Sequence, residues 1–199
     1  MQGLQGDKLG VKYRKLRNVI ALAFFLAAAV VAVNSAVKLM FPLKYKQYVY
    51  KYSAEHGIDP YLIFAIIKAE SSFNPWATSV KDAKGLMQIT EKTGIWGAES
   101  LKIKNFSVDS LYDPETNIRI GCWYISMLMK EFDNNMDLVI AAYNGGSGNV
   151  SGWLKDRNYS RSGNSLEKIP FKETDRFLKK VKNYYSIYKS LYKNFCQDM

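Results

Sequence analysis

The hydrophobic residues form one long run near the N-terminus and then shorter stretches at helical spacing. From Val19 to Val33 every residue is Ala, Val, Ile, Leu or Phe, and the apolar character resumes after Ser35 as far as Phe41. A helix from about Leu16 to about Lys38 is long enough to cross the roughly 30 Å hydrocarbon layer of a bilayer. The pattern therefore predicts one transmembrane helix ahead of the rest of the chain.

After residue 41 the pattern predicts helices joined by polar loops, without the sustained alternation that is typical of strands. Asp59-Pro60 and Asp113-Pro114 each place a capping residue before a first-turn proline, which is a common start of a helix. The predicted helices are Pro42 to about Glu55, Tyr61 to about Ser71, Gly85 to Ile89, Pro114 to about Phe132, Asp137 to Asn144, and about Glu173 to Phe195. In the last of them, apolar side chains recur at three- and four-residue steps, so we expect that stripe to pack in the core.

The charge is concentrated at the two ends of the chain. The 199 residues carry a formal net charge of +10, and residues 1–51 contain nine basic residues against one acidic residue. Residues 52–167 are slightly acidic. A central basic groove for nucleic acid is therefore not expected. The length suits one domain with an attached segment.

The basic residues before the apolar run predict its orientation. Lys12, Arg14, Lys15 and Arg17 lie within a few residues of the run, and such residues stay in the cytoplasm. The sequence thus predicts a cytoplasmic basic segment at 1–18, a membrane anchor at 19–38 and an extracytoplasmic domain at 42–199. A cleaved signal peptide is the alternative, although the segment before Ser35 makes a poor cleavage site.

The cysteines and the single histidine indicate no metal or thiol chemistry. Cys122 and Cys196 both follow the apolar run, where a disulfide is permitted, but Cys122 is equally suited to be a buried thiol. His56 stands alone beside Gly57, where it suits a helix end. We find neither the spacing of a zinc site nor a nucleophile-histidine pair, and we expect no metal and no cofactor.

Glu70 is the first candidate for catalysis. It shares a helix face with Ile63, Ile66 and Ile67, which lie three and four residues apart. A carboxyl group at the end of an apolar stripe loses hydration, which raises its pKa and suits it to donate a proton near neutral pH. The alternative is a frayed last turn with Glu70 pointing into water.

Several short motifs follow Glu70 in a distinctive order. They are Glu70-Ser71-Ser72-Phe73-Asn74-Pro75, Gly85-Leu86-Met87-Gln88-Ile89, Asp113-Pro114-Glu115-Thr116-Asn117-Ile118, Ala141-Ala142-Tyr143-Asn144-Gly145-Gly146 and Ile169-Pro170-Phe171-Lys172-Glu173-Thr174. In this order and spacing the chain resembles the soluble lytic transglycosylase (SLT) family of the lysozyme-like superfamily, over about residues 47–192.

The resemblance implies a mainly α, lysozyme-like helical domain (SLT or goose type) after one N-terminal transmembrane helix. It also implies that Glu70 is the sole acid/base in cleavage of the β-1,4 bond between N-acetylmuramic acid and N-acetylglucosamine of peptidoglycan, which closes a 1,6-anhydro ring. The expected partners are glycan strands and the lipid bilayer.

Three alternatives stay open. One is hydrolysis on the same fold, as in goose-type lysozyme, with Asp82, Glu91 or Asp113 as a second acid, although Asp113 also suits a helix cap. Another is a non-catalytic wall-binding module of an envelope assembly. The third, which is compatible with catalysis, is that the basic helix from Glu173 contacts anionic lipid or anionic wall polymer.

The resemblance also implies substrate-binding roles for Ser79, Met87, Gln88, Tyr143 and Asn144, each with a structural alternative. Ser79 would contact the sugar or the catalytic carboxyl, or else cap a turn. Met87 would line the cleft and Gln88 would offer its amide to an acetamido sugar, or else both are core residues. Tyr143 and Asn144 would lie at the cleft floor, although an Asn before Gly often ends a helix for backbone reasons.

The sequence departs from the family at Phe177. Members of the family usually have a tyrosine at this position, whose hydroxyl group can reach the catalytic acid. Phe177 keeps the ring and lacks the hydroxyl. The hydrogen bonding around Glu70 is therefore open, with Tyr143 or Tyr184 as possible replacements.

Overall fold

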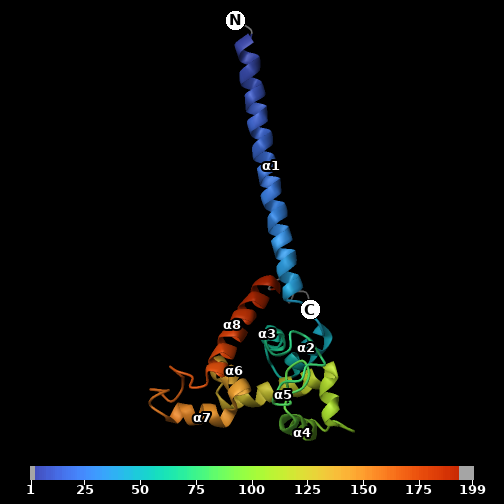
Figure 1. The fold of residues 1–199 in the computed structure, drawn as a ribbon, viewed down its shortest axis with the longest axis vertical. Helices are drawn as coiled ribbons and strands as arrows, with labels where there is room; N and C mark the ends of the chain where they lie inside the picture. Colours follow the sequence, from blue (N-terminus) through green and yellow to red (C-terminus); the bar gives the residue numbers. More distant parts are fainter. Residues whose placement is uncertain (1–2, 193–199) are drawn as a thin grey trace. The chain divides into compact units, whose positions relative to one another are not determined.

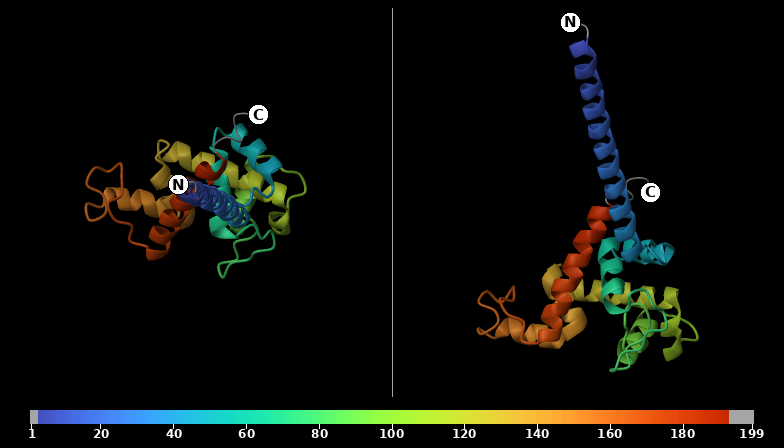
Figure 2. Two further views of the ribbon diagram at one scale, coloured as in Figure 1. Left: turned by 90° about the horizontal axis from the view of Figure 1, so that it is seen from above. Right: turned by 45° about the horizontal axis from the view of Figure 1, so that its top comes forward.

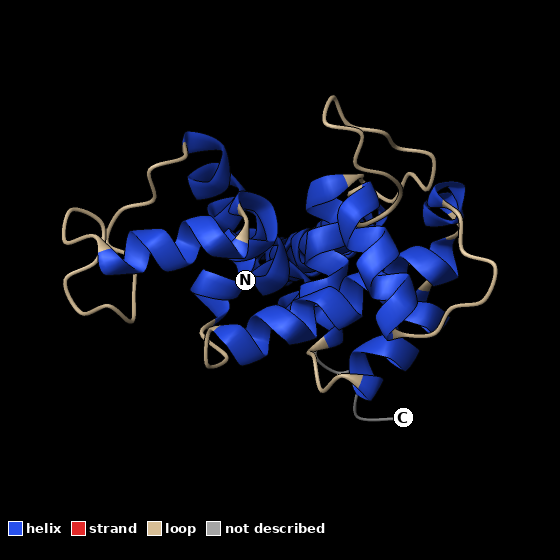
Figure 3. Ribbon diagram, turned by 90° about the horizontal axis from the view of Figure 1, so that it is seen from below, coloured by secondary structure: helices blue, strands red, loops and turns tan. Residues whose placement is uncertain are grey.

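The computed structural model describes residues 3–192, which form helices joined by loops (Figure 1; Figure 3). The helices are α1 (Gly3–Met40), α2 (Lys46–Glu55), α3 (Pro60–Glu70), α4 (Glu91–Ser100), the 3-10 helix η1 (Val108–Tyr112), α5 (Pro114–Glu131), α6 (Met136–Gly145), α7 (Ser147–Lys155) and α8 (Lys172–Tyr192). Extended pairing within these residues is limited to two isolated antiparallel bridges, Thr78 with Lys84 and Lys84 with Ile89. The predicted mainly α class is confirmed.

The chain divides into two compact units, Met1–Pro42 and Leu43–Met199. The first contains α1, whose segment Leu16–Met40 is 25 residues long and qualifies as a membrane span by length and composition. Its large apolar side chains are exposed, as Phe24 (78%) and Leu39 (83%) show. This exposure fits a helix whose neighbour is lipid rather than protein.

The centre of the second unit is α3. All seven residues from Tyr61 to Ile67 are buried, because α2 and α8 pack against different sides of the helix. Figures 1 and 2 show α3 and α8 side by side, and the rings of Phe64 and Tyr188 stack with centroids 5.6 Å apart. The helix begins as predicted, since the Asp59 side chain accepts a hydrogen bond from the Tyr61 N–H. α3 therefore holds its last residue, Glu70, in a fixed place.

Two predicted helices differ in the structure. The helix expected from Pro42 begins later, at Lys46, because Tyr45 has a left-handed backbone (φ 58°). Gly85 to Ile89 is a tight turn rather than a helix. It is closed by backbone hydrogen bonds between Lys84 and Ile89 and has Gly85 at φ 77°. A Cβ on Gly85 would lie 2.1 Å from the Leu111 carbonyl oxygen, so this close approach requires glycine.

The pattern did not predict α4, α7 or η1. In α4, Gly94 and Gly97 lower the helix propensity, and the helix depends on packing instead. A Cβ on Gly97 would lie 2.7 Å from Ile120 of α5, so the glycine allows the two helices to approach closely. Tertiary packing thus overrides the local sequence signal in this region.

The last helix, α8, buries Thr174, Phe177, Val181 and Tyr188, which confirms the predicted core stripe. The helix is described as far as Tyr192, so the predicted end at Phe195 lies outside the described residues. Three lysines of α8 form ion pairs, which are Lys179 with Asp175, Lys182 with Asp137 and Lys189 with Asp59.

Cys122 and His56 have structural positions. Cys122 is a buried free thiol whose pKa is raised by burial, and Cys196 lies outside the described residues. His56 caps the C-terminal end of α2 beside Gly57. Among residues 3–192 no group of three or more histidine, cysteine or acidic side chains is placed to hold a metal ion.

Candidate active site

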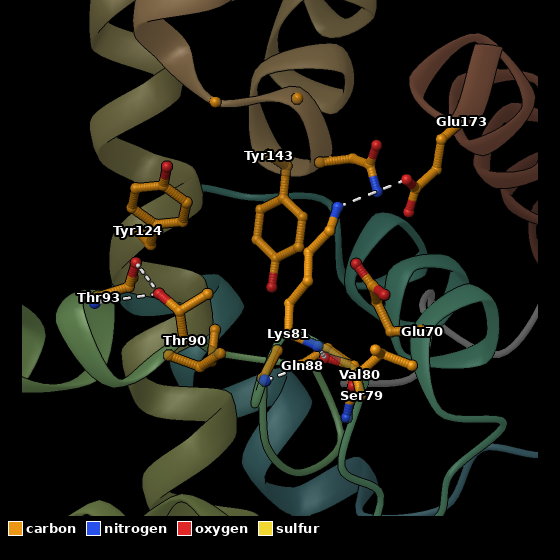
Figure 4. A pocket seen from close by; sticks show the side chains of 15 residues that line it. Glu70, Ser79, Val80, Lys81, Gln88, Thr90, Thr93, Tyr124, Tyr143 and Glu173 are labelled. Atoms are coloured by element: carbon orange, nitrogen blue, oxygen red, sulfur yellow. Dashed lines mark hydrogen bonds and ion pairs between the residues drawn. The ribbon is translucent and has the colours of Figure 1, made fainter. Parts of the chain in front are cut away.

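Glu70 lies in the wall of a cavity of about 560 Å³ (Figure 4). The cavity is built from the end of α3, the loop before α4, the first turn of α4, α5, the junction of α6 and α7, and the start of α8. Its lining includes Glu70, Ser79, Lys81, Gln88, Thr90, Thr93, Tyr124, Tyr143, Asn144 and Glu173. Residues from distant parts of the sequence thus share one cavity.

The last turn of α3 is closed, not frayed. The N–H of Ser71 donates to the Ile67 carbonyl oxygen at 3.0 Å, and the Ser71 hydroxyl donates to the Leu86 carbonyl oxygen at 2.8 Å. Glu70 is partly buried, and burial raises the pKa of its carboxyl group to about 7. The positive charge of Lys180 opposes this rise, and the negative charge of Glu173 adds to it. Near neutral pH the carboxyl group therefore exists in both protonation states.

Tyr143 connects α6 to the loop before α4. Its hydroxyl group donates to the Met87 carbonyl oxygen at 2.7 Å, and its ring lies parallel to the Phe177 ring with centroids 6.5 Å apart. Burial raises the pKa of Tyr143 well above its usual value, so the hydroxyl stays a neutral donor. The Phe177 position thus contributes a stacked ring, and the Tyr143 hydroxyl is engaged by Met87 rather than by Glu70.

Ser79 and Asn144 have structural contacts as well as places in the cavity wall. The Ser79 hydroxyl oxygen accepts from the N–H groups of Lys81 and Ala83, at 3.2 and 3.0 Å. The Asn144 carbonyl oxygen Oδ1 accepts from the Thr174 hydroxyl at 2.9 Å, which joins α6 to α8. The hydroxyl proton of Ser79 and the amide group Nδ2 of Asn144 remain for a ligand.

Gln88 lines the cavity, whereas Met87 does not. Gln88 Nε2 donates to the carbonyl oxygens of Ala77 and Gly85, at 3.1 and 2.9 Å, which leaves its Oε1 for a ligand. The Met87 side chain is fully buried and fills the space beside Gly121 of α5, where a Cβ would lie 2.3 Å from its sulfur. The Met87 side chain thus has the core position that was the alternative to lining the cleft.

Comparison with known proteins supports the family that the motifs suggest. Residues 47–165, more than half of the chain, match the model of the transglycosylase SLT domain. The chain belongs to the transglycosylase SLT family. The predicted membership is confirmed.

The relatives extend the match beyond that model. The soluble lytic murein transglycosylase of Escherichia coli K12 is 36% identical over 159 residues, which cover 75% of this chain and 23% of that protein. The membrane-bound lytic murein transglycosylase C of Sodalis glossinidius is 36% identical over 168 residues, covering 70% of this chain and 45% of that protein. The chain therefore spans about a quarter of the length of the first relative and less than half of the length of the second.

Solved structures share the fold of the SLT domain. The 70 kDa soluble lytic transglycosylase of Escherichia coli superposes with a TM-score of 0.71 at 35% identity, covering 77% of this chain and 25% of that one. An inactive mutant of the lytic transglycosylase Slt from Pseudomonas aeruginosa gives 0.70 at 33% identity, over the same shares of the two chains. The predicted lysozyme-like helical domain is thereby confirmed.

The SLT domain also positions groups that the sequence did not single out. Lys81 and Glu173 form an ion pair of 3.5 Å that joins the loop before α4 to α8 beside Tyr143 (Figure 4). Tyr124 of α5 lines the opposite part of the cavity. Glu173 belongs to a motif noted in the sequence, but Tyr124 lies in an apolar stretch and gave no local signal.

Asn117 of α5 binds the loop before α4. The sequence alone did not predict this role. Its side chain is fully buried and accepts from the Met87 N–H at 2.8 Å. Its Nδ2 group donates to the carbonyl oxygens of Lys84 and Leu111, at 2.9 and 2.7 Å. The side chain thus satisfies three buried backbone groups and supports the residues that face Glu70.

The three acidic residues considered as a second acid for hydrolysis do not line the cavity that contains Glu70. Asp113 accepts from the Thr116 N–H and caps α5, and Asp82 is paired with Lys84. Glu91 lines a separate hollow on α4. Among the residues that the structure describes, the carboxyl groups in the cavity are those of Glu70 and Glu173.

Proposed function

We propose that this chain is a membrane-anchored lytic transglycosylase of peptidoglycan, with Glu70 as its single acid and base. The substrate bond is the β-1,4 bond between N-acetylmuramic acid and N-acetylglucosamine. The observation that carries the proposal is the place of Glu70, a partly buried carboxyl group with a pKa raised to about 7, in the wall of a cavity of about 560 Å³ in an SLT domain.

In the proposed reaction, protonated Glu70 donates its proton to the glycosidic oxygen as the bond to the muramic C1 breaks. The resulting carboxylate then accepts the proton of the muramic C6 hydroxyl, whose oxygen bonds to C1 and closes the 1,6-anhydro ring. Glu70 ends protonated and no water is consumed. A pKa near neutrality suits both halves of this cycle, because the same group must give and take a proton.

The other residues of the cavity would bind the sugars. The Ser79 hydroxyl, the Asn144 amide group and the Gln88 Oε1 atom offer one donor or acceptor each toward hydroxyl and acetamido groups. Met87 would act through its backbone, because its carbonyl oxygen holds the Tyr143 hydroxyl in place.

Hydrolysis is a second candidate because Glu173 supplies another carboxylate at the cavity. In ordinary glycosidases the second carboxylate acts as a nucleophile or as a base for water. Here Glu173 is 3.5 Å from Lys81, a pairing that competes with either role. This engagement favours the anhydro route over hydrolysis.

Digestion of purified sacculi tests the proposal. The wild-type chain is expected to release muropeptides that are one water lighter than hydrolysis products and have no reducing end, as read by mass spectrometry. Products with reducing ends would show hydrolysis instead. Binding to sacculi without cleavage would indicate a non-catalytic wall-binding module.

Substitution of Glu70 tests its role. Glu70→Gln keeps the shape of the side chain and removes its acid, so we expect activity to fall by at least about 100-fold. Glu55→Gln is the matched control, because Glu55 ends α2 as Glu70 ends α3 but is exposed and outside the cavity. Wall turnover that survives Glu70→Gln would remove Glu70 from the mechanism.

We also propose that α1 anchors the protein in the cytoplasmic membrane, with residues 1–18 in the cytoplasm and residues 42–199 outside. Its span Leu16–Met40 and the basic residues before it support this topology. Protease added to spheroplasts should digest the SLT domain, and the N-terminal residues should remain in the membrane fraction. A mature protein that begins after residue 35 would instead show a cleaved signal peptide.

A further inference from the structure

Asn144 and Thr174 join two helices at the wall of the cavity that contains Glu70. The helices α6 and α8 pack against each other (Figure 1), and the Thr174 hydroxyl donates a hydrogen bond of 2.9 Å to Oδ1 of Asn144. Thr174 is 1% exposed, whereas Asn144 lines the cavity. The hydrogen bond therefore connects a buried group to a group that a ligand in the cavity can reach.

This hydrogen bond fixes the rotation of the Asn144 amide group. The two ends of an amide side chain have nearly the same shape, and a half-turn about its last bond exchanges the acceptor Oδ1 with the donor Nδ2. Within residues 3–192 the Oδ1 atom of Asn144 is engaged by Thr174, and its Nδ2 group has no hydrogen-bond partner. The end that remains for the cavity is therefore a donor.

The backbone beside Asn144 supports the same arrangement. A Cβ on Gly145 would lie 3.0 Å from the Thr174 hydroxyl oxygen and 3.2 Å from the Thr174 methyl carbon, so glycine lets Thr174 come close. The Asn149 amide group donates to the Gly145 carbonyl oxygen at 2.7 Å and helps to satisfy the end of α6. The backbone of Asn144 is thus held by α6, and the rotation of its side chain is held by Thr174.

A donor with a fixed orientation distinguishes between the groups that a glycan strand offers. A sugar hydroxyl group can donate or accept, so it suits either end of an amide. The carbonyl oxygen of an acetamido group can only accept, so it requires the donor end. The orientation of Asn144 therefore matters for acetamido groups more than for hydroxyl groups.

We propose that Thr174 is a positioning residue, which holds Asn144 as a donor to an acetamido carbonyl oxygen and so makes the cavity prefer N-acetylated strands. This inference rests on the proposed function. Thr174 is buried and acts through Asn144. Without the Thr174 hydroxyl, the orientation that donates to the ligand leaves Oδ1 without its donor, which disfavours that orientation.

Binding to strands with and without acetyl groups tests the inference. Peptide-free glycan strands, N-acetylated or chemically de-N-acetylated, are bound to the full-length Glu70→Gln chain in detergent, which separates binding from cleavage. In this background we expect Thr174→Val to weaken binding of the N-acetylated strand about fivefold, and that of the de-N-acetylated strand by less than about twofold. Thr174→Ser keeps the hydroxyl group and should restore the preference for N-acetylated strands.

Two further variants keep the test decisive. Tyr185→Phe is the control, because the Tyr185 hydroxyl donates to Asp59 at 2.7 Å and so ties α8 to the start of α3 outside the cavity. This variant should keep the preference for N-acetylated strands. Gly145→Ala places a Cβ against the Thr174 hydroxyl and should act like Thr174→Val even if Thr174→Val does not fold.

Three outcomes would overturn the inference. One is equal weakening for both strands in Thr174→Val, which would make the hydrogen bond a structural contact between α6 and α8 alone. Another is an unchanged preference in both Thr174→Val and Gly145→Ala. The third is equal affinity for the two strands in the Glu70→Gln chain itself. Absence of cleavage by the wild-type chain would instead contradict the proposed function, and the binding measurement would still decide the role of Thr174.

Discussion

The ammonium group of Lys180 donates a hydrogen bond of 2.7 Å to the carbonyl oxygen of Ala69, the residue directly before Glu70. This carbonyl belongs to the last turn of α3, where helical partners are lacking. The contact brings a positive charge from α8 close to Glu70, and that charge lowers the pKa that burial raises. Lys180 is therefore placed to position and tune the proposed acid.

The first prediction concerns Lys180→Met. Removing the cation leaves Glu70 facing Glu173 of α8 and the neutral hydroxyl of Tyr143, so the pKa of Glu70 should rise further. The protonated acid then persists to higher pH. We expect the alkaline limb of the pH–rate profile on sacculi to move upward relative to wild type.

Two variants separate this effect from a loss of structure. Lys179→Met removes a neighbouring lysine that pairs with Asp175 on the same helix. This variant should have the same alkaline limb of the pH–rate profile as the wild type. Lys180→Arg keeps the charge and should largely restore the wild-type profile. An alkaline limb that does not move in Lys180→Met would contradict the role of Lys180.

The second prediction is that Glu70→Gln stabilises the fold at alkaline pH. The pKa of Glu70 is about 7 in the folded protein and 4.5 ordinarily, so between these pH values the folded protein holds a proton on Glu70 that the unfolded chain has lost. The folded protein therefore loses stability as the pH rises from 4.5 to about 7. Above about pH 7, the partly buried Glu70 carboxylate costs roughly 3 kcal/mol of stability, and the neutral glutamine avoids this cost. Urea unfolding should show the variant more stable than wild type at about pH 8 and similar to it at about pH 4. Equal stability at both pH values would contradict a buried, raised Glu70.

The third prediction compares Tyr143→Phe with Tyr124→Phe. The first leaves the Met87 carbonyl oxygen without its 2.7 Å donor and should lower the free energy of unfolding by roughly 1–3 kcal/mol. The second removes a hydroxyl group that forms no hydrogen bond within the described residues, so its effect should be smaller. Chemical denaturation measures both, and a reversed order would contradict the role of the Tyr143 hydrogen bond.

The fourth prediction concerns Asn117→Ala. The change leaves the Met87 N–H and the Leu111 carbonyl oxygen without their partner, and it removes one of the two donors to the Lys84 carbonyl oxygen, which also accepts from the Ile89 N–H. It should destabilise the SLT domain by roughly 3–5 kcal/mol. Asn158→Ala, at an exposed loop position, is the control and should change stability by less than about 0.5 kcal/mol. Thermal unfolding of the two variants makes the comparison.

The lysines of α8 show where sequence reasoning stops. Counting residues suggested a basic face for anionic lipid or wall polymer, because the partners of these lysines are far away in the sequence. In the structure Asp137 and Asp59 pair with Lys182 and Lys189 across helices. The net positive charge of this face is therefore smaller than the sequence indicates, which weakens that interpretation.

The sequence by itself determined the helices whose signals are local. The Asp-Pro caps of α3 and α5, the apolar run of α1 and the buried stripe of α8 depend on residues a few positions apart, and short-range sterics and burial set them. The order of motifs likewise determined the family. The position of Glu70 at the end of an apolar stripe identified the candidate acid.

Only the tertiary structure decided how the surroundings of Glu70 are arranged. The Gly85 turn, the burial of Met87 against Gly121 and the Trp96–Trp123 contact depend on how closely distant segments approach. Such approaches follow from the packing of whole helices, which no short stretch of sequence encodes. The raised pKa of Glu70 has the same origin, because it requires α8 and the loop before α4 to exclude water from one carboxyl group.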